Sequence, residues 1–191
     1  GRGEAFDYLL GEKTSDSAMM AIKYAAKLMI NSKKCVISVN GNAVALCAAD
    51  LIRCAAVLQC PIEINIYYRT DNRMKALNSR LKDVKKEVMI AEPPTGWLGD
   101  WRGAVNDVII LGDNPNARIP GLDGPRANCC KDGIFDADVI FVPLEDGDRC
   151  EALMKMGKEV IVVDLNPLSR TAKMATVTIV DELTRVGPLL L

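Results

Sequence analysis

Apolar residues recur along the chain with two periods, one typical of helices and the other typical of buried strands. Continuous apolar and β-branched runs predict strands, whereas apolar residues spaced three or four apart predict helices. Strands are predicted at residues 35–39, 62–68, 88–90, 108–111, 138–142, 160–164 and 176–180, with 108–111 central in the sheet. Helices are predicted at residues 14–31, 42–59, 71–85, 148–156 and 168–174, and from Asp181 onward.

The alternation of these strands and helices determines the expected fold. Strands that are apolar throughout are buried on both faces, which is typical of parallel sheets covered by helices. We therefore expect an α/β fold, a Rossmann-like three-layer α/β/α arrangement with a mostly parallel sheet, in one domain over residues 1–191. Residues 112–132 are rich in Gly, Pro and Asn and predict a long, functional loop. Residues 93–101, with two tryptophans, predict another loop.

Composition narrows the classes of partner. A net charge of −1 gives no general attraction to nucleic acid or to an anionic membrane, and only 5% of the residues are aromatic. The longest apolar runs are strand-sized, so we expect no membrane span, and no secretory signal is recognisable. Seven scattered cysteines are read as reduced thiols of a cytoplasmic protein, with Cys47 and Cys54 on the core face of a helix. Cys129 and Cys130 give only a weak indication of metal binding.

The chain contains no histidine. This excludes Ser-His-Asp and Cys-His nucleophile schemes and histidine-ligated metals. Any chemistry must depend on carboxylates, Lys, Arg, backbone amides and oxygen-ligated metals. Phosphate chemistry fits these groups best, because positioning and charge neutralisation supply most of its catalysis.

Two predicted strand ends on the N-terminal side carry candidate phosphate ligands. Asn40, Gly41 and Asn42 form a tight turn before a helix, whose free amides and dipole favour an anion. The alternative is an ordinary turn in which Asn42 caps the helix. Arg69 follows the next strand and is either a bidentate phosphate ligand or a solvated surface residue.

Two further strand ends are denser in polar residues. Glu145, Asp146 and Asp148 crowd together before a helix, either to share a divalent cation or cationic group or to cap that helix. Residues 164–171 read DLNPLSRT, and this density of donors and acceptors at a strand end favours a ligand site over a structural turn. Asp164 would hold a ribose or a metal, and Arg170 and Thr171 would meet phosphate oxygens.

Several long segments together resemble the archaeal-type phosphopantothenate synthetases, also called 4-phosphopantoate–β-alanine ligases. The matching segments are GRGEAFDYLLGEKT (1–14), ISVNGNA (37–43), YYRT (67–70), VIFVPLEDGD (139–148), EALMKMGK (151–158), DLNPLSRT (164–171) and TIVDE (178–182). They span nearly the whole chain, although residues 92–130 match less well.

The resemblance implies a cytoplasmic, homodimeric ligase of coenzyme A biosynthesis that uses ATP, and we expect Mg²⁺ as a second cofactor. Such an enzyme converts 4-phosphopantoate to an acyl adenylate, from which β-alanine displaces AMP. The resemblance also implies that ATP is held by Asp164, Leu165, Asn166, Arg170, Thr171, Glu182 and Leu183. Our hypothesis is that Arg170, with Mg²⁺, is the catalytic cation that offsets the charge developing on the triphosphate. Asn40, Gly41, Asn42 and Arg69 would bind the substrate, and residues 112–132 would act as the lid. The family carries an N-terminal part of which residues 1–13 would be a remnant.

Two other functions remain open at this point. One is a nucleotide-binding sensor or subunit without turnover. The other is a nicotinamide-dependent reductase on the same type of sheet. The absence of a GxGxxG turn disfavours the reductase, as does the sequence Tyr68-Arg69 where an acidic residue would be expected.

Overall fold

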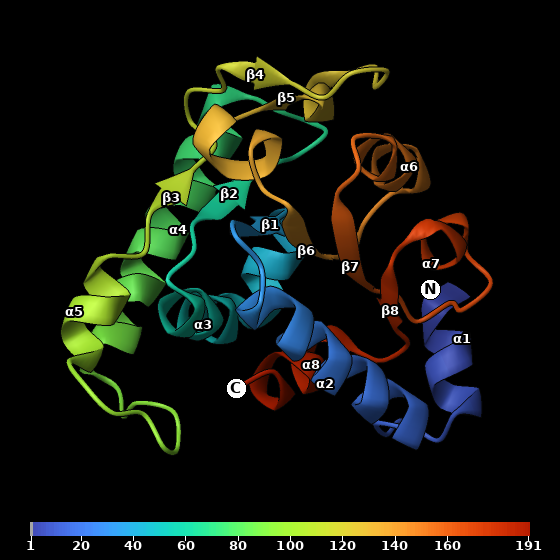
Figure 1. Ribbon diagram of the computed structural model, residues 1–191, viewed down its shortest axis with the longest axis horizontal. Helices are drawn as coiled ribbons and strands as arrows, with labels where there is room; N and C mark the ends of the chain where they lie inside the picture. Colours follow the sequence, from blue (N-terminus) through green and yellow to red (C-terminus); the bar gives the residue numbers. More distant parts are fainter. Residues whose placement is uncertain (1) are drawn as a thin grey trace.

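Six parallel strands form the main sheet of the computed structural model, which describes residues 2–191 (Figure 1). The strands are β1 (Cys35–Val39), β2 (Ile62–Ile64), β3 (Ile110–Leu111), β6 (Val139–Pro143), β7 (Glu159–Val163) and β8 (Val177–Ile179). Their order is β3-β2-β1-β6-β7-β8, and each neighbouring pair is parallel. This order confirms the predicted Rossmann-like fold.

The strand order creates one switch point in the sheet. The chain builds outward from β1 through β2 to β3, then returns to the centre with β6 and builds outward on the other side. β1 and β6 are therefore neighbours whose outgoing connections run in opposite directions. The crevice above their carboxyl ends is where open α/β sheets bind ligands.

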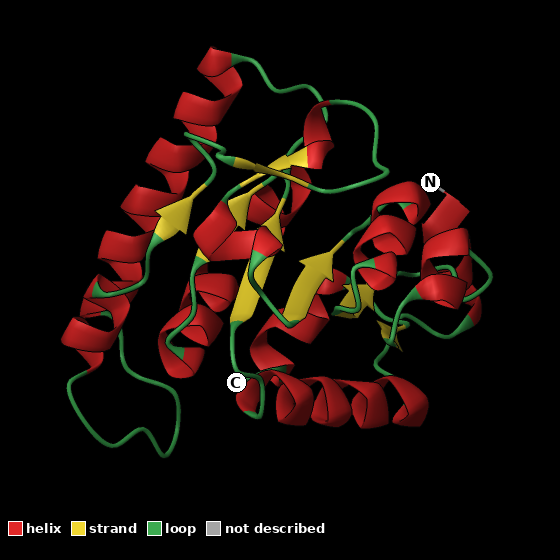
Figure 2. Cartoon of the chain, turned by 45° about the horizontal axis from the view of Figure 1, so that its top comes forward, coloured by secondary structure: helices red, strands yellow, loops and turns green. Residues whose placement is uncertain are grey.

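Helices cover both faces of the sheet (Figure 2). They are α1 (Arg2–Leu9), α2 (Asp16–Ile30), α3 (Gly41–Leu58), α4 (Asp71–Ile90), α5 (Trp101–Asn106), α6 (Gly147–Lys155), α7 (Arg170–Met174) and α8 (Leu183–Leu189). The segment between β3 and β6 holds only short elements, as predicted. These are β4 (Ala117–Arg118), the 3-10 turn η1 (Pro125–Ala127), β5 (Asn128–Cys129) and the single π-type turn η2 (Lys131–Phe135).

Alternate residues of β1, β6 and β7 pack into two separate cores. Ile37 and Phe141 face a core built with α2, α3, α4 and α8. Val36 and Ile140 face the opposite core, which α6 and the segment 117–137 complete. Each fully buried aliphatic side chain contributes roughly 1.5–3 kcal/mol relative to exposure. The two cores hold the sheet rigid beneath the loops at its carboxyl edge.

Helix α3 is the most apolar helix of the described chain. It is long and apolar enough by composition to cross a membrane, but half of it is buried inside the protein. Its buried side contacts β1, α4 and α8. Core helices of globular folds have this same composition, and α3 packs as one of them.

The structure corrects three of the predicted elements. Residues 88–90 are not a strand but the last turn of α4, because Leu81, Val84 and Val88 continue one buried helical stripe. Strand β2 ends at Ile64 rather than at residue 68, and Tyr67 and Tyr68 are exposed beyond it.

The third correction concerns the predicted central strand at residues 108–111. Its observed part, β3, is two residues long and lies at the edge of the sheet, paired only with β2. The predicted loop at residues 93–101 also ends earlier than expected. Trp101 begins α5, and its indole nitrogen donates a hydrogen bond to the carbonyl of Val88.

All seven cysteines are buried free thiols, which predicts very low reactivity. Burial raises the pKa of Cys47, Cys54, Cys129 and Cys150 to about 12. Because the thiolate is the reactive form, little of it exists at pH 8 in the native state. We expect a thiol-reactive disulfide reagent to label the native protein only as fast as it unfolds, and to titrate seven thiols in denaturant. Rapid labelling of two or more native thiols would contradict this burial.

Candidate functional site

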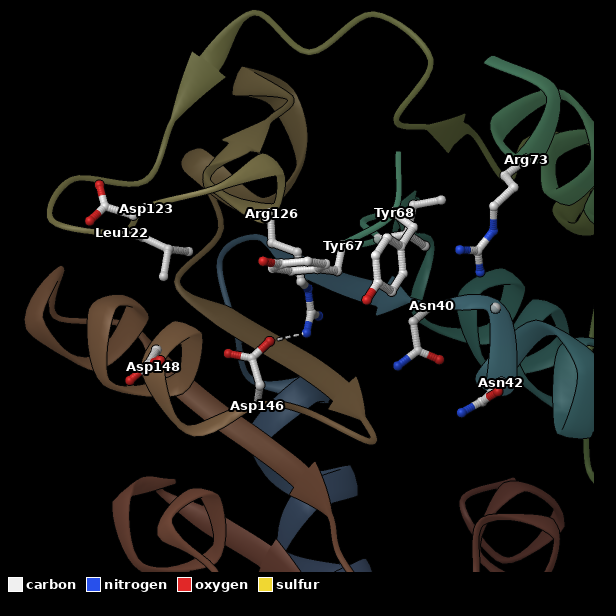
Figure 3. Close-up of a pocket in the computed structure, with 12 residues that line it drawn as sticks. Asn40, Asn42, Tyr67, Tyr68, Arg73, Leu122, Asp123, Arg126, Asp146 and Asp148 are labelled. Atoms are coloured by element: carbon white, nitrogen blue, oxygen red, sulfur yellow. Dashed lines mark hydrogen bonds and ion pairs between the residues drawn. The ribbon is translucent and has the colours of Figure 1, made fainter. Parts of the chain in front are cut away.

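A cavity of about 500 Å³ opens at the switch point, above the carboxyl ends of β2, β1 and β6 (Figure 3). Its lining comes from the turn before α3, the segment after β2, the start of α4, the segment between β4 and β5, and the turn before α6. The lining residues are Asn40, Gly41, Asn42, Ile66, Tyr67, Tyr68, Arg73, Leu122, Asp123, Arg126, Asp146 and Asp148. The predicted Asn40–Asn42 turn therefore lies in a cavity, as a ligand site requires.

Asn40 connects the two strands that form the switch point. Its side-chain oxygen accepts a hydrogen bond from the amide of Ala43 at 3.0 Å, and its side-chain amide donates to the carbonyl of Leu144 at 2.9 Å. Asn40 is thus the N-cap of α3, and the alternative in which Asn42 caps this helix is wrong. Asn42 is instead left on the wall of the cavity.

Arg73 brings a positive charge to the same cavity from the first turn of α4. Its guanidinium lies 6.0 Å from the ring centroid of Tyr68, a cation–π contact. A Cβ added at Gly41 would lie 3.7 Å from its Nη2 atom, so Arg73 stands close to the start of α3. Sequence reasoning missed Arg73, although a cation in a helix's first turn opposes the helix dipole and is a usable signal.

Arg126 is the second cation of the cavity and is far more buried. Its side chain is 10% exposed. Nε donates to Asn65 Oδ1 at 3.2 Å, and Nη1 lies 2.9 Å from Glu145 Oε1 and also binds Asp146 Oδ2. Arg126 was missed because it lies in an irregular loop whose position depends on contacts distant in sequence.

Two buried polar residues of β2 and its extension hold that loop in place. Glu63 accepts hydrogen bonds from the amides of Cys130 and Ile134, both at 2.8 Å. Asn65 donates to the carbonyls of Arg126 and Asn128. Burial raises the pKa of Glu63, while the two amide donors oppose that rise. These bonds anchor the segment between β4 and β6 directly to the sheet.

The acidic cluster before α6 is neutralised by arginines. Glu145 and Arg149 have fully buried side chains, with Arg149 Nη1 2.6 Å from Glu145 Oε2. Arg149 also donates to Ser38 Oγ on β1 at 2.7 Å. Burial raises the pKa of Glu145 and lowers that of Arg149, and the charge of each opposes the shift of the other. Asp146 caps α6. The cluster therefore combines both predicted interpretations: arginine side chains neutralise Glu145 and Asp146, and Asp146 also caps α6.

The predicted C-terminal ligand segment is tied together largely by its own bonds. Asp164 accepts from the amide of Asn166 at 2.9 Å and from the hydroxyl of Ser169. Ser169 caps α7, and the buried Thr171 donates to the carbonyl of Glu145 at 3.2 Å. The segment is therefore a turn after β7 that its own hydrogen bonds stabilise, and Thr171 attaches it to the turn that carries the acidic cluster.

Of the predicted ATP-site residues, Arg170 lines a cavity beside the one at the switch point. It lines a second cavity of about 330 Å³, which shares Leu122, Asp123 and Asp148 with the first. Its exposed guanidinium forms ion pairs with Asp148 and Glu151. Gly147 allows this approach, because a Cβ there would lie 2.9 Å from Arg170 Cδ. Leu122 and Asp123 thus separate two adjoining cavities.

The remaining predicted site residues lie elsewhere. Arg69 donates to the carbonyls of Gly112 and Asp113 and lines neither cavity, so its observed role is to anchor a loop. Glu182 caps α8 by accepting from the amide of Thr184 at 2.8 Å, and Leu183 is buried. Leu165, like Asp164 and Asn166, lies in the turn after β7, outside both cavities. Within residues 2–191 no three His, Cys, Asp or Glu side chains group as a metal site.

Comparison with known proteins gives consistent matches. A family model described as phosphopantothenate/pantothenate synthetase matches residues 17–191. Proteins named 4-phosphopantoate–β-alanine ligase from Thermococcus onnurineus and Thermococcus kodakarensis are each 45% identical over 188 residues, 98% of this chain and 64% of theirs. One from Methanosarcina mazei is 43% identical over 185 residues, 97% of this chain and 64% of its own.

The chain therefore spans about 64% of the length of these curated relatives. The family match covers both halves of the sheet and every residue that lines the two cavities. This chain belongs to the phosphopantothenate/pantothenate synthetase family.

Proposed function

We propose that this protein joins 4-phosphopantoate to β-alanine at the expense of ATP, giving 4′-phosphopantothenate, AMP and pyrophosphate. One observation carries the proposal beyond family membership. The cavity at the switch point presents two guanidinium groups, Arg73 and Arg126, beside the N-terminus of the 18-residue helix α3. That set of donors suits a small acid bearing a phosphate group.

The reaction needs no side-chain nucleophile. The carboxylate of phosphopantoate attacks the α-phosphorus of ATP and pyrophosphate leaves. The amine of β-alanine then attacks the acyl carbon, loses a proton and expels AMP. A chain without histidine can support both steps by holding the reactants, neutralising phosphate charge and excluding water. Residues 112–132 would provide the lid, since Leu122 and Asp123 line both cavities.

The second cavity is the proposed position of the triphosphate. Arg170 and Lys155 are the cations that line it, and the neighbouring turns at residues 164–166 and 182–183 would complete the nucleotide site. Mg²⁺ commonly binds through one or two carboxylates together with substrate phosphates rather than in an all-protein cage. Asp148, which pairs with Arg170 and lines both cavities, fits that limited role. A bound Mg²⁺ would offset phosphate charge, and Arg170 would orient the same group.

We further propose that the protein is a cytoplasmic homodimer without a nucleic-acid or membrane partner. Its seven free thiols suit a reducing compartment. Met20 and Tyr24 lie one turn apart on α2 with 72% and 56% of their surfaces exposed, which marks this side of α2 as a candidate contact. Sedimentation of wild type and of Tyr24→Lys tests this: the variant should shift toward monomer, and an unchanged dimer would exclude α2.

The catalytic proposal is tested by AMP release from the full-length protein. AMP formation should require both 4-phosphopantoate and β-alanine. Arg170→Ala should lower kcat/KM for ATP by about 10²-fold, as expected for loss of one charged donor. Lys173→Ala, an exposed cation one turn along on the same side of the molecule, is the matched control. Unchanged turnover in Arg170→Ala would remove this residue from the mechanism.

The ion pairs of Arg170 give a second prediction. Glu151 holds the guanidinium in the absence of nucleotide and adds a negative charge beside the proposed triphosphate. Glu151→Gln should therefore lower the KM for ATP by about two- to fivefold, an effect limited by solvent screening. Glu159→Gln, exposed at the opposite end of β7, should leave the KM unchanged. A higher KM in Glu151→Gln would show that this carboxylate assists ATP binding, for instance through Mg²⁺.

A further inference from the structure

We propose that Arg126 is the residue that distinguishes the phosphorylated acid from its unphosphorylated form, and that Glu145 and Arg149 act as positioning residues for it. This inference rests on the proposed function and adds to it the source of substrate specificity. The family description includes both phosphopantothenate and pantothenate synthesis, so membership alone does not say which acid this chain selects.

The position of Arg126 is the first argument. It enters the cavity from the segment between β4 and β5, while Arg73 enters from α4, and the Asn40–Asn42 turn lies nearby (Figure 3). Three unconnected parts of the chain thus bring donors to one space of about 500 Å³. An anion placed there would meet a helix N-terminus and two guanidinium groups.

The hydrogen bonds of Arg126 are the second argument. Nε and Nη1 are occupied by Asn65, Glu145 and Asp146. Nη2 has no hydrogen-bond partner among residues 2–191, and it is not one of the buried atoms sealed without a partner. This nitrogen is therefore open to the cavity while the rest of the guanidinium is fixed. The Nε and Nη1 atoms of Arg126 bind protein groups, and the Nη2 atom is available to a ligand.

The buried pair beneath Arg126 is the third argument. Glu145 receives Arg126 on one oxygen and Arg149 on the other, and Arg149 is bonded to Ser38 on β1. Burying this many charges is costly, and such pairs are not in general retained for stability alone. Here Glu145, which follows β6, and Arg149, which bonds to β1, fix the orientation of Arg126 relative to these two central strands. A guanidinium fixed in this way loses little conformational entropy when a ligand binds.

This arrangement discriminates by charge. A phosphate monoester carries close to two negative charges at neutral pH. The unphosphorylated acid has a neutral hydroxyl there and leaves the open edge of Arg126 without an ionic partner. A site built around a charged donor rejects the analogue that lacks the matching group far more strongly than a hydrophobic pocket does.

The test measures kcat/KM for 4-phosphopantoate and for pantoate by AMP release, with thermal melts to verify folding. Arg126→Lys keeps the positive charge but lacks the planar guanidinium that binds the protein and the ligand at the same time. We expect the ratio of kcat/KM for the phosphorylated over the unphosphorylated acid to fall by at least about tenfold. Arg102→Lys, exposed on α5, is the matched control and should keep the wild-type ratio. An equal loss for both acids in Arg126→Lys would overturn the assignment.

The positioning role has a separate readout. Glu145→Gln keeps the shape of the side chain and removes its charge. The loss should appear mainly as a higher KM for 4-phosphopantoate rather than as a lower kcat, with a smaller change in KM for pantoate. If Glu145→Gln folds poorly, the double variant Glu145→Gln/Arg149→Met removes both buried charges and is measured in its place. A loss confined to kcat, or equal for both acids, would reduce Glu145 to a structural residue.

Direct binding separates this inference from the proposed function. Calorimetric titration with 4-phosphopantoate and with inorganic phosphate requires no turnover. If the protein forms no AMP but Arg126→Lys weakens 4-phosphopantoate binding by about tenfold or more, the ligase proposal fails and the role of Arg126 stands. If AMP forms and the affinity is the same in Arg126→Lys, the ligase proposal stands and the role of Arg126 fails.

Discussion

The candidate site depends on a buried ionic network between β1 and β6. Glu145 lies between Arg126 and Arg149 with its side chain fully buried, and Arg149 extends the network to Ser38 on β1. Removing one member of such a network leaves an uncompensated charge, which typically costs about 3–5 kcal/mol. The network therefore fixes the geometry of the turn before α6, the start of α6 and the guanidinium that faces the cavity.

The Rossmann-like strand order explains why this network lies beside a ligand cavity. Strands are added to the sheet in one direction after β1 and in the opposite direction after β6, which separates the turns that follow these two strands. Asn40 bridges that separation through the carbonyl of Leu144. The loop between β4 and β5 forms one wall of the cavity, and Asn65 holds it by a bond to the carbonyl of Arg126. Glu63 holds the segment that follows β5. The strand order creates the cavity, the bonds from β2 and its extension place the loop beside it, and that loop brings Arg126 to the ionic network.

Local pattern predicted much of this fold, and long-range contacts account for the rest. Strand β1 was predicted to the residue, because its apolar run depends only on neighbouring residues. The Asn40–Asn42 turn lines the cavity, and its role in binding substrate stays a prediction. Arg73 and Arg126 were missed because their roles depend on where α4 and an irregular loop meet the cavity. Arg69, which was predicted to bind substrate, follows β2 as expected but turns to the carbonyls of residues 112 and 113.

The most direct measurement of the central claim is a crystal structure of the full-length protein with 4-phosphopantoate bound. The account predicts the phosphate group between Arg126 Nη2 and the amino end of α3, with Arg126 still paired to Glu145. A phosphate bound elsewhere, with the open edge of Arg126 facing only water, would contradict it.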